Sequence, residues 1–87
     1  VVMTPRETTI VKGALRALVG AGGAGLSEGA LAEQAGTFSE MLLSSLERRA
    51  LLHTLLAKDL AERFEDPLTD VPRFVLTDRG RLALGAL

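Results

Sequence analysis

Side chains able to contact a nucleic acid gather between residues 37 and 49. The candidate contact residues are hydroxyls, a carboxylate and two guanidinium groups: Thr37, Ser39, Glu40, Ser44, Arg48 and Arg49. Hydroxyl groups bond to phosphates or to base edges, glutamate accepts from the amino group of cytosine, and arginine binds phosphate oxygens. However, no arginine, lysine, asparagine or glutamine occurs before Arg48 in this stretch, and these residues most often read bases.

The rest of the chain offers little for catalysis or metal binding. His53 is the only histidine and there is no cysteine, so a metal site would need carboxylates assembled from elsewhere. As a general base, His53 would need a positioned nucleophile or acid, which no motif supplies. We therefore expect no enzyme activity, no metal and no cofactor, and interpret His53 as a structural or surface residue. Without cysteine there are no disulfides, which is compatible with the reducing cytoplasm.

Two further segments superficially resemble ligand-binding loops. The glycine-rich run 20–25 lacks the preceding strand and the following lysine of a phosphate-binding loop, so we interpret it as a flexible connector. The segment from Asp59 to Asp70 is rich in carboxylates but lacks the spacing and central glycine of a calcium-binding loop. It is typical of a solvated acidic loop, with docking to a basic partner as the functional alternative.

Length and composition limit the architecture. The 87 residues suit one domain, residues 1–87. The hydrophobic share is 47% with only 3 phenylalanines as aromatics, so alanine, leucine and valine must form the core, which favours closely packed helices. No apolar run approaches the roughly 18 to 20 residues of a membrane span, and the start does not have the pattern of a signal peptide. The net charge of −1 predicts no general affinity for polyanions.

The pattern of apolar residues predicts three helices in the first part of the chain. Thr4 and Pro5 have the character of a helix start, and the glycine run 20–25 should end that helix. Ser27 should cap a short second helix that ends at Gly36. A third helix, capped by Thr37 or Ser39, should run through residues 41–46 toward Arg49, with Leu46 in the core.

After Arg49 two interpretations remain open. Residues 50–56 form a strand, or the third helix continues to Phe64, because the apolar residues fit either period. The segment from Glu65 to Pro72 is a loop closed by prolines. Residues 73–76 then form a short strand, and Thr77 caps a last helix from Asp78 to Leu87.

Three segments, in this order, resemble the winged helix-turn-helix domain of bacterial transcriptional regulators. Residues 25–36 are similar to the turn and helix that open the motif, residues 46–52 to the exit from its recognition helix, and residues 74–84 to the strand and helix that close the domain. The resemblance implies a mainly α fold with a small antiparallel β wing and binding to double-stranded DNA. The early positions of the third helix would then face the major groove.

That resemblance also implies roles for individual residues. Thr37, Ser39, Glu40 and Ser44 would approach the bases, while Arg48 and Arg49 would contact phosphates, with Arg6, Lys12 or Arg16 from the first helix. The chain departs from the family at Ala50, where glycine usually stands between helix and strand. It also departs in the connection 58–72, which is long and acidic where a wing that grips DNA is usually basic.

A second class of function remains beside DNA binding. The same scaffold could serve as a protein interaction or dimerisation module, which the near-neutral charge and the acidic wing region favour. Five leucines between residues 51 and 60 exceed what one face of a short element can bury. We therefore expect a homodimer through this segment or through the terminal helices, because large exposed apolar patches mark interfaces.

Overall fold

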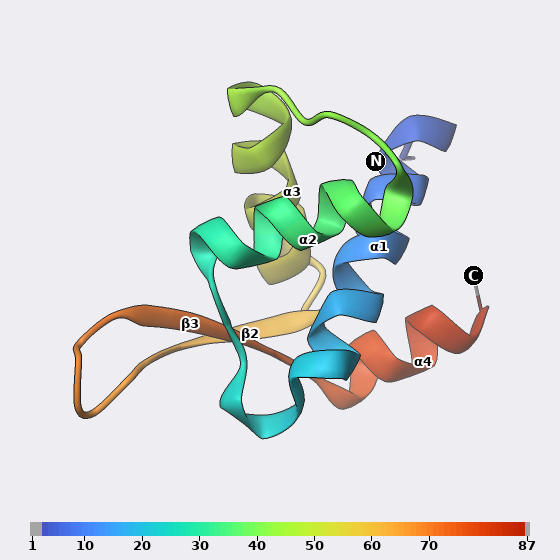
Figure 1. The fold of residues 1–87 in the computed structure, drawn as a ribbon. Helices are drawn as coiled ribbons and strands as arrows, with labels where there is room; N and C mark the ends of the chain where they lie inside the picture. Colours follow the sequence, from blue (N-terminus) through green and yellow to red (C-terminus); the bar gives the residue numbers. More distant parts are fainter. Residues whose placement is uncertain (1–2, 87) are drawn as a thin grey trace.

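The computed structural model describes residues 3–86. The elements in chain order are α1 (Pro5–Ala21), the 3-10 turn η1 (Gly22–Ala24), β1 (Leu26–Ser27), α2 (Glu28–Ser39), α3 (Ser45–Ala57), β2 (Ala61–Glu65), β3 (Pro72–Leu76) and α4 (Asp78–Ala86). The strands form an antiparallel sheet in the order β1, β3, β2. The fold is thus mainly helical with a small sheet, and the β2–β3 hairpin projects from the helices (Figure 1).

Helix α1 begins and ends where the sequence predicts. The Thr4 side chain accepts from the backbone N–H of Glu7, Pro5 occupies the first helical turn, and Gly22 ends the helix with a φ of 61°. One face of α1 is buried, and its largest fully buried side chains are Leu15 and Leu18. This helix forms the centre of the core, to which α2, α3, the sheet and α4 all contribute side chains.

A glycine lets α2 cross α1 closely. A Cβ atom at Gly13 would lie 2.8 Å from the carbonyl oxygen of Ala35 and 3.2 Å from the backbone nitrogen of Ser39. Any larger residue would push the two helices apart, so Gly13 fixes their separation. Ala35, on the same face of α2, is fully buried.

The sheet closes the other side of the core. Leu26 of β1 lies opposite Phe74 of β3, and Arg63 of β2 lies opposite Phe74 on the other side. Phe74 is buried, whereas Phe64 of the hairpin is only half-buried. The predicted strand at 73–76 is therefore confirmed, and it is the central strand of the sheet.

The start of α4 is held by Thr77, as predicted. The Thr77 hydroxyl accepts from the backbone N–H of Gly80 at 2.9 Å and donates to the carbonyl oxygen of Asp59 at 2.6 Å. Gly80 packs directly on the carbonyl oxygen of Leu60, where no Cβ atom would fit. The sequence around Thr77 thus joins the end of the sheet to α4 by close backbone contact.

The predicted boundary between the second and third helices is wrong. Helix α2 continues past Gly36 to Ser39, and α3 begins only at Ser45. Glu40 ends α2 in the left-handed conformation, with a φ of 57°, and the N–H of Met41 donates to the carbonyl of Gly36. The turn thus has the hydrogen bonding typical of a glycine stop but carries a glutamate, which is why the sequence pattern misplaced it.

Neither interpretation of the segment after Arg49 is correct as stated. Helix α3 continues to Ala57, and the strand β2 occupies residues 61–65. The helix ends in the same way as α2, with Asp59 at a φ of 57° and the N–H of Leu60 donating to the carbonyl of Leu55. The connection within the hairpin joins Glu65 to Pro72, which confirms the predicted loop, and it is shorter than the connection 58–72 that the comparison with the family assumed.

The leucines are also placed differently from the prediction. Leu46 was expected in the core but is 77% exposed, because the late start of α3 turns this position outward. Leu51, Leu55 and Leu60, by contrast, are buried in the core. The leucines that led us to expect a dimer through residues 51–60 are therefore mostly buried within the domain.

Candidate functional site

Helix α3 presents an exposed face without a carboxylate. Its inner side is set by Leu51 and Leu55, which are buried. The opposite side carries exposed residues at helical spacing: Leu46, Arg49, His53 and Leu56. The only acidic residue of the helix, Glu47, turns instead toward α1. A chain with a net charge of −1 thus keeps a basic and apolar surface on this helix.

An ion pair fixes how α3 is oriented on α1. The Arg6 guanidinium donates to the two carboxylate oxygens of Glu47 at 2.7 and 3.2 Å, and to the carbonyl oxygen of Leu42 at 3.3 Å. Glu47 also accepts from the backbone N–H of Ser44, while the Ser44 hydroxyl accepts from the N–H of Glu47, so the helix start is capped reciprocally. The guanidinium beside it lowers the pKa of Glu47 to about 2.

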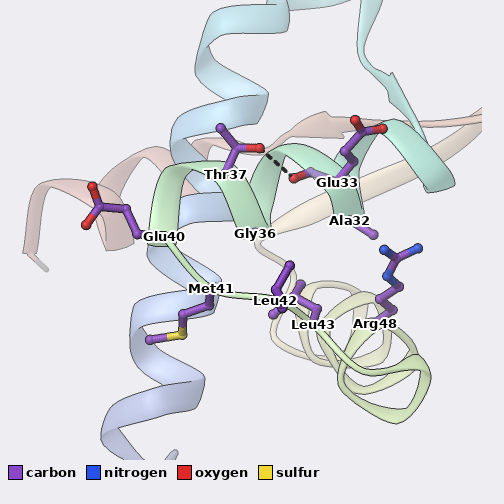
Figure 2. Close-up of a pocket in the computed structure, with 9 residues that line it drawn as sticks. All are labelled: Ala32, Glu33, Gly36, Thr37, Glu40, Met41, Leu42, Leu43 and Arg48. Carbon is purple, nitrogen blue, oxygen red and sulfur yellow. Dashed lines mark hydrogen bonds between the residues drawn. The ribbon is translucent and has the colours of Figure 1, made fainter.

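A hollow of about 370 Å³ lies between the end of α2 and the start of α3 (Figure 2). Its lining combines apolar and charged residues from both helices and from their connection: Ala32, Glu33, Gly36, Thr37, Glu40, Met41, Leu42, Leu43 and Arg48. Arg48 reaches from α3 toward α2, whereas Glu40 points away from the other side chains (Figure 2). The Thr37 hydroxyl donates to the carbonyl oxygen of Glu33 at 3.1 Å.

The candidate residues from the sequence fall into two groups. Thr37 and Ser39 belong to the last turn of α2, and Glu40 ends that helix. Ser44 caps α3, and Arg48 and Arg49 lie on it. The expectation that all six residues share one helix is therefore wrong, although Thr37, Glu40 and Arg48 do line the same hollow.

The hydroxyl groups among these candidates have internal partners. Ser39 donates to the carbonyl oxygens of Ala35 and Gly36 at 2.6 and 3.2 Å. Ser44 is bound in the cap of α3. Of the predicted set, Arg48 and Arg49 are thus the exposed side chains on α3 itself.

Sequence reasoning missed Ser45 and His53 as candidate contacts. Both are exposed on α3, Ser45 in the first turn and His53 on the outward face. The signal that could have found them is the spacing of Ser44 and Glu47, a capping pattern that places the helix start at Ser45. From that start, the outward positions follow by helical periodicity.

The basic residues of α1 do not extend this surface. Arg6 is bound to Glu47, and Lys12 and Arg16 line a different hollow together with Phe38 and Ser39. The side of α1 that meets α3 carries Glu7 and Ile10 instead. Any phosphate contact from Lys12 or Arg16 would therefore lie on another side of α1 from α3.

The β2–β3 hairpin is acidic, as its sequence indicates. Its carboxylates are Glu62, Glu65, Asp66 and Asp70, against the cations Arg63 and Arg73. Arg73 donates to Asp66 at 3.2 Å, and Asp66 also accepts from the backbone N–H of Leu68. That backbone hydrogen bond is the main reason why the pKa of Asp66 is lowered.

The described part of the chain contains no group of three or more histidine, cysteine or acidic side chains placed to hold a metal ion. None of the helices within residues 3–86 is long and apolar enough to cross a membrane. Comparison of the chain with protein-family models, with curated proteins and with solved structures found no match.

Proposed function

We propose that this chain is a winged helix-turn-helix domain that binds double-stranded DNA through α3. The observation that carries the proposal is the outward face of α3, which bears Arg49 and His53 and no carboxylate. The order of helices and strands supports it, since a helix pair is followed by a hairpin and a closing helix, with β1 completing the sheet. This is the arrangement that a winged helix uses to present its recognition helix.

In this proposal α3 lies in the major groove, which is wide enough for one helix. Arg49 and His53 would donate to base edges, and the exposed Leu46 would contact a thymine methyl group. Arg48, at the side of the helix, would bind a phosphate and set the register. The Arg6–Glu47 pair holds the helix at a fixed angle and neutralises the one carboxylate of α3.

The test is a fluorescence anisotropy titration of the protein with random duplex DNA at low salt. We expect weak binding that falls with salt by a shallow slope, because few phosphates are neutralised. Replacing both Arg48 and Arg49 by alanine should lower affinity for random duplex DNA, because one phosphate contact and one base contact are lost. Arg79→Ala with Arg81→Ala, an equal loss of charge at two exposed positions of α4, is the matched control and should matter less.

Two outcomes would contradict DNA binding by α3. One is the absence of binding at low salt even at high protein concentration. The other is an equal loss of affinity in the α3 and α4 double variants, which would show that only overall charge matters. His53→Ala should in addition change the preference among sequences, because a base contact carries sequence information and a phosphate contact does not.

A protein interaction module is the second candidate, favoured by one specific observation. Leu42, in the connection before α3, lines the hollow together with Arg48 and is 94% exposed, and Leu46 in the first turn of α3 is 77% exposed. If DNA binding fails, the proposal is that this apolar edge and the acidic hairpin contact protein. Replacing both leucines by serine would then weaken that contact, and would leave the domain folded because neither side chain is buried.

A further inference from the structure

Strand β2 forms a free edge of the sheet. In the order β1, β3, β2 it pairs with β3 on one side and with no other strand among the described residues. The N–H of Thr77 donates to the carbonyl of Leu60, and the N–H of Asp66 to that of Val71, at the two ends of the β2–β3 ladder. Because hydrogen-bonded pairs alternate in an antiparallel ladder, the backbone groups of Ala61, Arg63 and Glu65 point to the open edge.

The side chains along this edge are self-complementary. Arg63 and Glu65 are exposed and carry opposite charges on one face of the strand, and Phe64 between them is half-buried on the other. If two copies of β2 align antiparallel with Phe64 at the centre, Arg63 of each copy lies directly opposite Glu65 of the other. Both residues have outward backbone groups, so each such pair can exchange its N–H and carbonyl hydrogen bonds.

We propose that two copies of this chain associate through β2, forming one continuous antiparallel sheet. The two Arg63–Glu65 pairs lie on one face and the two Phe64 rings meet on the other, in a pair without backbone hydrogen bonds, where side chains approach most closely. This interaction goes beyond the proposed function and does not depend on it. It also gives the acidic hairpin a role that does not require contact with phosphates.

Charge selects this register over the alternative. Centring the pairing on Arg63 would place two arginines opposite each other, and like charges in that position are destabilising. A shift of the pairing by one residue would place opposite each other residues whose side chains point to opposite faces of the sheet. In the favoured register Glu62 lies opposite Asp66 of the second copy, whose carboxylate is already bound by Arg73 at 3.2 Å.

The edge is accessible for such pairing. The hairpin extends away from the helices, with β3 and β2 side by side and the connection at the far end (Figure 1). Glu62, Arg63 and Glu65 are all exposed, while Ala61, where the strand leaves α3, is buried. The contact would therefore use the outer half of β2 and would be small, which is typical of weak and transient association.

The experiment is sedimentation equilibrium of charge-reversed variants. The wild-type chain should show a monomer–dimer equilibrium at protein concentrations up to about 1 mM. Arg63→Glu alone places two glutamates opposite each other, and Glu65→Arg alone places two arginines opposite each other. Each should weaken dimerisation about tenfold or more, because both pairs of the symmetric contact change from attraction to repulsion.

Two combinations of these substitutions should restore dimerisation. Mixed in equal amounts, Arg63→Glu and Glu65→Arg should form a heterodimer, because every glutamate then lies opposite an arginine. The double variant Arg63→Glu with Glu65→Arg should dimerise like the wild type. Circular dichroism of each variant verifies folding, and Arg79→Glu on α4 is the matched control, which should leave the dimer unchanged.

A wild-type chain that remains monomeric throughout overturns the proposal. So does a dimer that the single charge reversals leave intact, since it would use another surface. Failure of the mixed variants to associate while the wild type dimerises would exclude this register. None of these results depends on whether α3 binds DNA, which the α3 variants test separately.

Discussion

The Arg6 guanidinium lies 2.7 Å from the carboxylate of Glu47 and joins the first turn of α1 to the first turn of α3. The same carboxylate caps α3 by accepting from the backbone N–H of Ser44. One side chain therefore both starts the helix and sets its position on the core. The proposed DNA-binding surface depends on this pair without including it.

The ion pair should make stability depend on pH in the acid range. The pKa of Glu47 is lowered to about 2 in the folded chain, so its contribution is fully present above the ordinary glutamate pKa and is lost as the pH falls toward 2. Glu47→Gln should thus lower the thermal midpoint at neutral pH, and the gap to the wild type should narrow as acid is added. A gap that stays constant from neutral pH to pH 2 would contradict the assignment.

Two leucines of α3 should respond differently to truncation. Leu55 is fully buried, so Leu55→Ala should lower the free energy of unfolding by roughly 2 to 5 kcal/mol, because a cavity adds to the lost transfer energy. Leu46 is 77% exposed, and Leu46→Ala should change stability by less than about 0.5 kcal/mol. Urea unfolding of both variants measures the difference. Equal losses would show that Leu46 packs against the domain.

Thr77 should contribute more than an ordinary helix cap. Removing its hydroxyl deletes the acceptor for Gly80 and the donor to Asp59, so Thr77→Ala should cost about 1 to 2 kcal/mol of unfolding free energy. Thr77→Ser keeps both hydrogen bonds and serves as the control. If the serine variant is as unstable as the alanine variant, the loss of stability comes from the methyl group and not from the hydroxyl.

Glycine at either left-handed turn should stabilise the domain. Glu40 and Asp59 each have a φ of 57°, a conformation that disfavours side chains by roughly 1 to 2 kcal/mol. Because glycine also loses more chain entropy on folding, we expect a net gain of about 0.5 to 1 kcal/mol for Asp59→Gly or Glu40→Gly. Chemical denaturation would measure it. A loss of stability in both variants would show that the acidic side chains have a structural role.

The starts of α1, α2 and α4 and the end of α1 could be predicted from this sequence, whereas the ends of α2 and α3 and the start of α3 could not. Thr4, Ser27 and Thr77 are hydroxyl residues at positions where a helix begins, and each accepts the expected backbone hydrogen bond. The turns that follow α2 and α3 place Glu40 and Asp59 in the left-handed conformation, and neither residue is the glycine that usually marks such a turn in a sequence. Tertiary packing imposes those turns, since Leu60 after the second of them is buried in the core.

The wrong start of the third helix also explains which candidate residues were misplaced. Moving the start of α3 to Ser45 leaves Thr37 and Ser39 on α2 and turns Leu46 to the solvent. Arg48 and Arg49 lie on α3 whichever start is used, so the prediction placed both of them on the correct helix. The pairing of Arg6 with Glu47 joins residues far apart in the chain, and no local pattern could have indicated it.

The short strand β1 has a consequence for how the chain folds. Helices α1 and α2, and likewise strands β2 and β3, are neighbours in the sequence, so each pair closes only a short loop and can form early. The pairing of Leu26 with Phe74 joins these two halves, and it needs Gly25 at a φ of 70°, where any Cβ atom would meet the carbonyl of Phe74 at 2.5 Å. We therefore expect the meeting of β1 and β3 to be the late, rate-limiting step, with Gly25 as the residue whose replacement most slows it.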